Sequence, residues 1–338
     1  AHPLASQVAL DILKQGGSAV DAAIAANAAL GLMEPTGNGI GGDLFAIVWD
    51  PASQTLYGYN GSGRSPRGQT LAQLQARIDA MKARGELSAD HQGIPPFGPL
   101  PVSVPGTVDG WFALHQRFGK LPMQQNLAPA IDYARNGYPV SPVIAYYLER
   151  NWAALQRVLG DSPLMDNIRD TWFQGGREPV AGEIVTNPDL GDTLETLARD
   201  GREAFYSGSL AQAMADYFAT MDGGLELDDF TTHRGQWVEP RQVSYRGYEL
   251  YELPPNGQGF AALQMLSILR NVELSRWPRG SAEVFHYMVE AKRLAFEDLA
   301  RFYADPDFAD VPVESLLSDD YGRQRFDLID PGRASAAY

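Results

Sequence analysis

The chain has 338 residues, 44% hydrophobic and 20% charged, which is an ordinary globular composition with enough length for a large core. Its net charge of −15 and isoelectric point near 4.7 argue against nucleic acid or an anionic membrane surface as a partner, because those surfaces are bound by clustered Lys and Arg. There is no cysteine, which excludes disulfides, thiol nucleophiles and thiolate metal sites.

No run of about 18 apolar residues occurs, so the sequence predicts no membrane-spanning helix. No signal peptide is visible either, and we expect a cytoplasmic protein. Because the chain starts at Ala1 rather than at a methionine, the alternative is a periplasmic protein whose signal segment preceded Ala1. Residues 1–338 are expected to form a single domain, since no repeat, low-complexity tract or obvious linker interrupts them.

Residues 4–33 are expected to form two helices, separated by a stop signal at Gly16 and Gly17. The glycine-rich stretch at 37–42 comes next and precedes an apolar strand at 44–49. Its spacing fits G-x-G-x-x-G, but a dinucleotide site needs a strand before the glycines and a helix after them, and here the order is reversed. We interpret the stretch as a tight helix-to-strand turn whose backbone passes close to another group, with a turn of no further role as the alternative.

A second strand at 55–59 follows the hairpin signal PASQ and leads into a loop at 60–68, NGSGRSPRG. Five prolines exclude regular structure from residues 93–106. Helices are further expected at 70–90, over 107–158 with breaks at 119–122 and 137–139, and over 188–222 with breaks at Gly201 and 206–208.

A third strand is expected at 243–251, where VSYRGYELY alternates and contains β-forming residues. It leads into a loop at 254–259, PPNGQG, and then into helices at 260–269 and 281–303. The remainder is expected to be irregular with one short helix, and its last six residues, RASAAY, to be frayed. So few strands among so many helices indicate that the chain is one part of a larger fold.

The usual signatures of a catalytic group are absent from the sequence. It contains no G-x-S-x-G elbow, no H-E-x-x-H, no histidines at metal-ligand spacing and no EF-hand loop. We therefore expect no metal and no cofactor, and we interpret the histidines and the acidic pairs as structural or solvated groups.

Two loops remain as candidates for a binding site, because both directly follow a strand. The loop at 60–68 supplies Ser62 and Arg64, and the loop at 254–259 supplies Asn256 and Gln258. Arg64 is able to clamp a carboxylate through two parallel hydrogen bonds. The alternative for Arg64 is an ion pair with one of the chain's 42 acidic residues.

Several stretches of the sequence carry a family likeness, and their number and order are far more specific than any short motif. They are HPLASQVALDILKQGGSAVDAAIAA at 2–26, EPTGNGIGGDLF at 34–45, VPGTVDGW at 104–111, A-P-A-I-x-x-A-R-x-G-Y at 128–138, F-Y-S-G at 205–208, YRGYELYELPPNGQGFAALQML at 245–266 and HYMVEAKRLAFEDLARFYADPDF at 286–308. On these stretches the chain resembles, from end to end, the large chain of the gamma-glutamyltranspeptidase family.

The resemblance implies an N-terminal-nucleophile hydrolase, made as one precursor that cuts itself into a large and a small chain. It implies an α+β fold, a four-layer αββα sandwich whose two central sheets draw strands from both chains. The nucleophile would be a threonine at the start of the small chain, just beyond Tyr338, with its own α-amine as base. The oxyanion hole would lie on that chain too. We therefore expect no catalytic residue in this chain, and a heterodimer or a dimer of heterodimers as the assembly.

Both candidate loops depart from the family members that cleave gamma-glutamyl bonds. Those members carry an arginine four residues before the proline that matches Pro66, and this arginine grips the glutamyl α-carboxylate; here the position holds Ser62. They also have P-P-S-S-G-G where this chain has PPNGQG. A serine cannot replace a bidentate charge-assisted contact, which is typically worth about 1.5–3 kcal/mol.

The two loops resemble instead the family's amidohydrolase branch, which includes oxamate amidohydrolase of purine catabolism and some acylases. We expect hydrolysis of an amide bond in a small carboxylate-bearing substrate, with oxamate as the candidate and Arg64 reaching its carboxylate. One alternative is a gamma-glutamyl hydrolase or transferase in which Arg64 or Arg67 takes the missing arginine's role, and another is a cephalosporin-type acylase. A third, from a different class, is a processed but catalytically silent protein that binds small anions.

Overall fold

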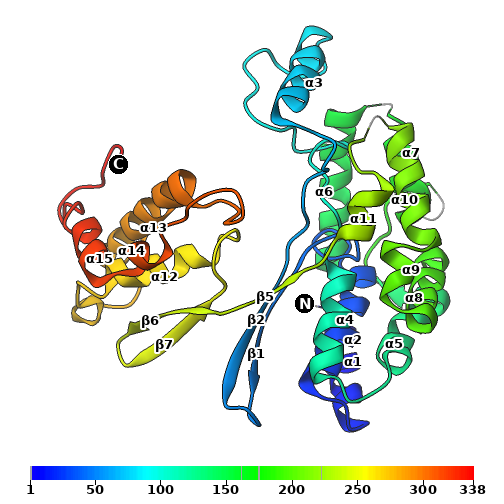
Figure 1. Ribbon diagram of the computed structural model, residues 1–338, viewed down its shortest axis with the longest axis horizontal. Coiled ribbons are helices and arrows are strands. Elements are labelled where there is room, and N and C mark those ends of the chain that lie inside the picture. Colours follow the sequence, from blue (N-terminus) through cyan, green and yellow to red (C-terminus); the bar gives the residue numbers. More distant parts are fainter. Residues whose placement is uncertain (1, 161, 174–175, 222) are drawn as a thin grey trace. The chain divides into compact units, whose positions relative to one another are not determined.

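The computed structural model describes residues 2–160, 162–173, 176–221 and 223–338. The chain divides into two compact units, each assembled from separate parts of the sequence (Figure 1). Unit 1 consists of Ala1–Leu44 and Gly61–Gly235, and unit 2 of Phe45–Asn60 and Gln236–Tyr338. The single domain expected over residues 1–338 stays a prediction.

Unit 1 is helical, and its first two helices confirm the sequence-based expectation. The helix α1, Pro3–Lys14, ends before the two glycines, and α2 spans Ala19–Met33. Ser18 caps α2 through a capping box in which its hydroxyl accepts a hydrogen bond from the Asp21 amide, and the Asp21 carboxylate accepts one from the Ser18 amide. The alanine-rich α2 packs against α1, α4 and α5, as small side chains on all its faces allow.

Asp21 also joins α2 to the segment between α4 and α5. Its carboxylate is fully buried and accepts hydrogen bonds from the amides of Lys120, at 2.8 Å, and Leu121, at 3.2 Å. The side-chain amide of Asn126 donates a further hydrogen bond, at 2.8 Å. Burial alone would raise the pKa of Asp21, but the hydrogen bonds from Ser18, Asn126 and the two amides outweigh it, and the pKa is lowered.

The other elements of unit 1 follow the predicted order with additions. The helix expected at 70–90 ends earlier, because Gly85 takes a positive φ directly after its C-cap Arg84. Elements that the sequence analysis missed are α7, α11 and a short antiparallel pair, β3 with β4. The bounds are α3 Leu71–Ala83, α4 Thr107–Phe118, α5 Met123–Asn136, β3 Tyr138–Pro139, α6 Pro142–Leu159, α7 Pro163–Trp172, β4 Ile184–Val185, α8 Pro188–Asp200, α9 Arg202–Tyr206, α10 Ser209–Thr220 and α11 Leu227–Thr232.

Unit 2 contains a small sheet with the strand order β1-β2-β5. The strands are β1, Leu44–Asp50, β2, Thr55–Gly61, and β5, Gln236–Val238, which the sequence analysis missed. β2 and β5 are antiparallel, with Tyr59 opposite Trp237. Segments far apart in the sequence therefore meet in this unit.

The single strand predicted at 243–251 is wrong. The segment is a hairpin of β6, Arg241–Tyr245, and β7, Tyr248–Glu252, joined by Arg246 and Gly247. Both turn residues have positive φ, 54° and 85°, the conformation that a two-residue hairpin turn requires. Because β-forming residues alternate on both sides of this turn, the sequence pattern did not indicate that the strand is interrupted there.

The helices α12, Phe260–Leu269, and α13, Ala282–Phe302, match the predicted helices closely and pack against each other. One core cluster lies between them, and its members include Ile268, Tyr287 and Leu294. After α13 the structure has two short helices rather than the one expected. The remaining bounds are η1 Leu274–Arg276, α14 Val313–Leu317 and α15 Asp319–Phe326.

The frayed C-terminal end predicted for the chain is also wrong. Tyr338 packs against the core cluster between α12 and α13. Its hydroxyl donates a hydrogen bond to the buried carboxylate of Glu290. The ring of Tyr338 and its hydrogen bond to Glu290 thus hold the end of this segment against α13.

Candidate functional site

The glycine turn, residues 37–42, leaves α2 and enters β1. None of its four glycines has a left-handed backbone, so positive φ is not the reason for glycine here. The Gly42 carbonyl accepts hydrogen bonds from the amides of Gly106 and Thr107, at 2.9 Å each. The Thr107 hydroxyl lies 2.8 Å from the same oxygen and 3.1 Å from the Asp43 carbonyl oxygen. The predicted close approach of this backbone to another group is therefore confirmed, and that group is the start of α4.

The loop after β2 crosses the same place. The Asp43 carboxylate accepts a hydrogen bond from the Gly63 amide at 2.8 Å. The Arg64 carbonyl accepts one from the Val104 amide at 3.0 Å. Ser62 and Arg64 are the two candidate binding residues of this loop, and these contacts fix the backbone directly after Ser62 and at Arg64. We call the meeting point of residues 39–43, 61–64 and 104–107 the loop junction.

At two positions of the loop junction there is no room for a residue larger than glycine. A Cβ atom on Gly63 would lie 2.0 Å from the Val104 carbonyl oxygen. A Cβ atom on Gly106 would lie 1.8 Å from the Gly61 carbonyl oxygen. Both distances are far inside van der Waals contact with backbone atoms, which cannot rotate away, so these glycines are needed for close packing rather than for a turn.

A buried ion pair supports the loop junction from within unit 1. Asp109 on α4 pairs with Arg202 on α9, and their side chains are 5% and 15% exposed. Asp109 also accepts a hydrogen bond from the Gly235 amide at 2.7 Å. The Tyr206 hydroxyl accepts a hydrogen bond from the Asp109 amide and donates one to the Pro105 carbonyl, at 3.0 and 2.7 Å. Pro105 belongs to the loop junction, so this network connects it to α9.

His233 completes the network. Its ring is buried and stacks on that of Tyr206, with the centroids 5.4 Å apart. Within the described part of the chain, neither ring nitrogen has a hydrogen-bond partner. Burial lowers the pKa of His233; Asp109 acts in the opposite direction, but nearby guanidinium groups, Arg64 among them, lower it too. The imidazole is therefore neutral at pH 7, and the Arg64 charge lies close enough to act on it.

The second candidate loop belongs to unit 2. The side-chain amide of Asn60, at the end of β2, donates a hydrogen bond to Asn256 Oδ1 at 2.8 Å. Asn256 is half-buried and Gln258 is exposed. The structure thus places Ser62 and Arg64 on one loop and Asn256 and Gln258 on another. It also brings Asn60, the residue from which the first loop starts, into contact with the second.

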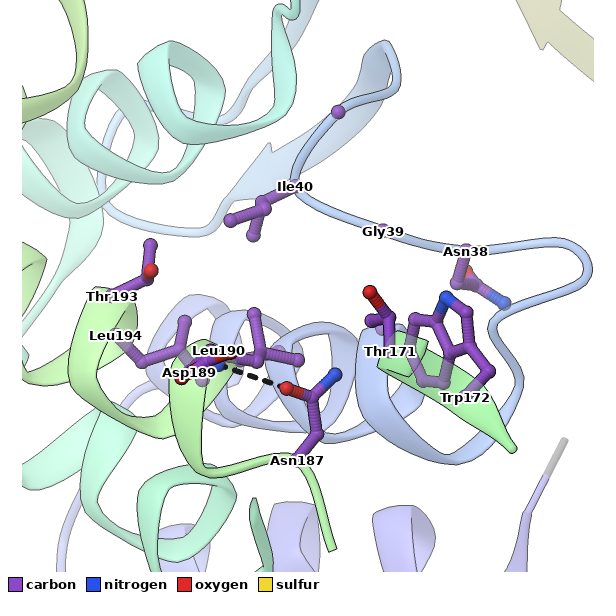
Figure 2. Close-up of a pocket in the computed structure, with 13 residues that line it drawn as sticks. Asn38, Gly39, Ile40, Thr171, Trp172, Asn187, Asp189, Leu190, Thr193 and Leu194 are labelled. Carbon is purple, nitrogen blue, oxygen red and sulfur yellow. Dashed lines mark hydrogen bonds between the residues drawn. The ribbon is translucent and has the colours of Figure 1, made fainter. Parts of the chain in front are cut away.

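The glycine turn lines part of two pockets. The pocket in Figure 2 has a volume of about 330 Å³ and is closed on one side by Asn38, Gly39 and Ile40. Residues of α2, the end of α7 and the start of α8 line the rest, and at α8 Asn187 Oδ1 accepts a hydrogen bond from the Leu190 amide at 3.0 Å. The second pocket, about 420 Å³, reaches the loop junction. Its lining residues are Asn27, Pro35, Thr36, Gly37, Asn38, Gly39, Gly41, Gly42, Asp43 and Thr107.

The described residues contain no cluster of three or more His, Asp or Glu side chains able to hold a metal ion. Across the same ranges of the chain, no helix has the length and apolar character needed to cross a membrane.

Residues 5–338 match the family model described as gamma-glutamyltranspeptidase. The chain belongs to this family. The glutathione hydrolase-like YwrD proenzyme of Bacillus subtilis is 38% identical over 323 residues, 96% of this chain and 58% of the relative. The oxamate amidohydrolase proenzyme of Klebsiella pneumoniae is 33% identical over 345 residues, 99% of this chain and 60% of the relative. The chain spans only 54–60% of the length of such curated relatives.

Solved structures of the family confirm the α+β fold. The cephalosporin acylase of Bacillus halodurans superposes with a TM-score of 0.88 at 40% identity, covering 98% of this chain and 59% of that one. The gamma-glutamyltranspeptidase of Helicobacter pylori gives a TM-score of 0.87 at 28% identity, covering 99% of this chain and 92% of that one. The relatives thus span several activities within one fold.

Proposed function

We propose that this protein is the large chain of a self-cleaving amide hydrolase whose nucleophile is the N-terminal threonine of a small chain from the same precursor. The observation that carries the proposal is the match of residues 5–338 to the family model, together with relatives that are named as proenzymes. The loop junction, with its required glycines and its buried supporting ion pair, supplies a rigid mount for a substrate-binding loop.

The proposed reaction proceeds through an ester. The threonine hydroxyl adds to the amide carbonyl carbon while its proton passes to the threonine's own α-amine. The C–N bond then breaks, and the leaving nitrogen takes that proton. Water next attacks the ester, its proton passes to the α-amine, and the C–O bond breaks to restore the threonine hydroxyl. The role of this chain is to bind and orient the substrate.

Unit 2 offers two apolar surfaces for the small chain. β1 lies at the edge of its sheet, and one of its faces exposes Phe45, Ile47 and Trp49, by 48%, 39% and 53%. A hydrophobic edge strand of this kind is prone to pair with another strand. A second surface runs along α13, on the face opposite the core. It consists of Phe285, Met288, Val289 and Phe296, which are 38–58% exposed. The small chain would cover both, and a dimer of such heterodimers stays a prediction.

We further propose that the substrate is a small amide with a carboxylate group, and oxamate is the candidate. At the position where gamma-glutamyl-cleaving members of the family carry an arginine, this chain has the uncharged Ser62. Arg64 lies two residues further along the same loop, and its guanidinium binds the carboxylate of a smaller substrate. Asn256 and Gln258 would contribute amide groups to the leaving end of the substrate.

Kinetics on the matured two-chain enzyme test this proposal. Ammonia release from oxamate is expected, with little transfer from a gamma-glutamyl anilide. Arg64→Ala is expected to raise KM for oxamate about tenfold to a hundredfold, the loss of a charge-assisted hydrogen bond. Arg67→Ala is the matched control, because Arg67 lies in the same loop but faces Asp228 at 3.7 Å on the exposed surface. Turnover of glutathione in place of oxamate rejects the proposed substrate.

The second candidate is a gamma-glutamyl or cephalosporin-type acyl substrate. It is favoured by the two relatives of highest identity given above, one named glutathione hydrolase-like and the other a cephalosporin acylase. Under this alternative Arg64→Ala raises KM for glutathione sharply and leaves oxamate unreactive.

A further inference from the structure

The F-Y-S-G stretch at 205–208, in which Tyr206 is the last residue of α9, places one tyrosine hydroxyl in the core of unit 1. The Tyr206 side chain is fully buried. Its ring stacks on the His233 ring, and the guanidinium carbon of Arg202 lies 4.3 Å from the ring centre. His233 is buried and Arg202 is paired with Asp109, so these neighbours hold the ring, and with it the hydroxyl, in one position.

This hydroxyl connects two backbone groups on either side of the start of α4. The Asp109 amide lies in the first turn of the helix, where N–H groups have no partner within the helix, and it donates to the hydroxyl at 3.0 Å. The hydroxyl in turn donates to the Pro105 carbonyl at 2.7 Å. Pro105 and Asp109 are both buried, so removal of the hydroxyl takes a hydrogen-bond partner from one donor and one acceptor in the core.

The segment that Tyr206 holds also makes the hydrogen bond that fixes the Arg64 backbone. Val104, directly before Pro105, is 2% exposed, and its amide donates to the Arg64 carbonyl at 3.0 Å. The Gly106 amide, directly after Pro105, donates to the Gly42 carbonyl at 2.9 Å. Pro105 is thus the middle one of three consecutive residues, and a displacement of its carbonyl moves the neighbouring residue that holds Arg64.

We propose that Tyr206 is a positioning residue for substrate binding and that it acts through Arg64. This inference rests on the proposed function, in which the Arg64 guanidinium binds the substrate carboxylate. A bidentate contact of this kind depends on the direction of both hydrogen bonds, so a small shift of the Arg64 backbone weakens it. Tyr206 is fully buried, and its effect on the substrate passes only through the backbone of Val104, Pro105 and Arg64.

Steady-state kinetics on the matured two-chain enzyme test this inference. The substrate is oxamate, or glutathione if the wild-type enzyme hydrolyses that amide instead, since Arg64 binds the carboxylate under both readings. Tyr206→Phe keeps the ring and removes only the hydroxyl, and it should raise KM about threefold to tenfold with kcat unchanged. In the Arg64→Ala background, Tyr206→Phe should raise KM no further, because both changes act on one contact.

The matched control is Tyr138→Phe. Tyr138 is 1% exposed and belongs to the same unit, and its hydroxyl donates to the Leu32 carbonyl at 2.9 Å, away from the loop junction. Tyr138→Phe should lower the urea midpoint of unfolding and keep the wild-type KM. Because both tyrosine variants lose stability, they are prepared and assayed in sucrose, which favours the folded state.

The possible outcomes separate the inference from the proposed function. If Arg64→Ala raises KM but Tyr206→Phe leaves it at the wild-type value, the inference is overturned and the proposed function stands. A further rise in KM when Tyr206→Phe is added to Arg64→Ala also overturns the inference, since Tyr206 then acts independently of Arg64. So does a Tyr206→Phe chain that fails to fold in sucrose, because its hydroxyl is then purely structural. Unchanged KM in Arg64→Ala overturns both the inference and the proposed role of Arg64.

Discussion

The carboxylate of Asp43 accepts a hydrogen bond from the amide of Gly63 at 2.8 Å and so ties the glycine turn to the loop that carries Ser62 and Arg64. This hydrogen bond therefore connects two segments that the sequence analysis treated separately, the glycine turn and the loop at 60–68. Asp43 itself is exposed, so its contribution is expected to appear in substrate binding more than in stability.

Asp43→Ala should raise KM for the substrate about fivefold to tenfold, since one hydrogen bond of about 1 kcal/mol no longer holds the loop. The melting temperature should change little. Asp43→Asn is the matched comparison, because its side-chain oxygen still accepts from Gly63 while the charge is gone. Equal KM values in Asp43→Ala and the wild type would contradict this role.

Gly106→Ala should destabilise the protein by about 2–3 kcal/mol or more, since the added methyl group meets the Gly61 carbonyl oxygen at 1.8 Å. Gly37→Ala is the control, in the glycine turn itself. No heavy atom of the described residues lies within 4 Å of its Cβ position, and its backbone is not left-handed. Urea unfolding of both variants is the measurement, and similar midpoints would refute the steric argument.

The buried Asp21 carboxylate should contribute to stability near neutral pH and lose that contribution in acid. Its pKa is lowered in the folded state, so its stabilisation is fully present above the unfolded value of about 3.9 and disappears as the pH falls through the folded pKa. Asp21→Asn should cost about 2–4 kcal/mol at pH 7, because its amide group faces backbone N–H donors. At pH 3, the difference in the free energy of unfolding between Asp21→Asn and the wild type should be smaller. Urea titrations at pH 7 and pH 3 test this.

The buried His233 should make stability fall between pH 7 and pH 5. Its folded-state pKa is lowered, so the unfolded chain binds a proton more readily, and stability decreases as the pH drops below the unfolded value of about 6.5. The expected slope is about 1.4 kcal/mol per pH unit for one proton. In His233→Gln this slope should vanish over the same range. Persistence of the wild-type slope in the variant would assign the effect to another group.

The sequence predicted those parts of the fold where local signals and packing agree. The helix predicted at 260–269 and the break between the first two helices at Gly16 and Gly17 are in place, because each depends on residues close together in the chain. The hairpin turn at Arg246 and Gly247 was missed since arginine rarely takes positive φ, and here a glycine beside it completes the turn. The pattern of β-forming residues gave no sign of the reversal.

The sequence analysis named the two candidate loops but not the side chains that support the loop junction. Ser62, Arg64, Asn256 and Gln258 were chosen because their loops follow a strand, and their contact with substrate stays a prediction. The ion pair of Asp109 with Arg202 and the stacked His233 were not found. Asp109 and Arg202 are 93 residues apart, and His233 follows α11 whereas its stacking partner Tyr206 belongs to α9, so no periodicity in a single sequence reports either pairing.

The discontinuity of unit 2 has a consequence for biosynthesis. Asn60 and its hydrogen-bond partner Asn256 are separated by 196 residues, so the early hairpin of β1 and β2 emerges long before the strand and loop that complete it. At a translation rate of ~5–20 residues per second, that delay is about 10–40 s. During this interval the side chains of Phe45, Ile47 and Trp49 are exposed on an incomplete chain, and transiently exposed apolar strands of this kind are prone to aggregate.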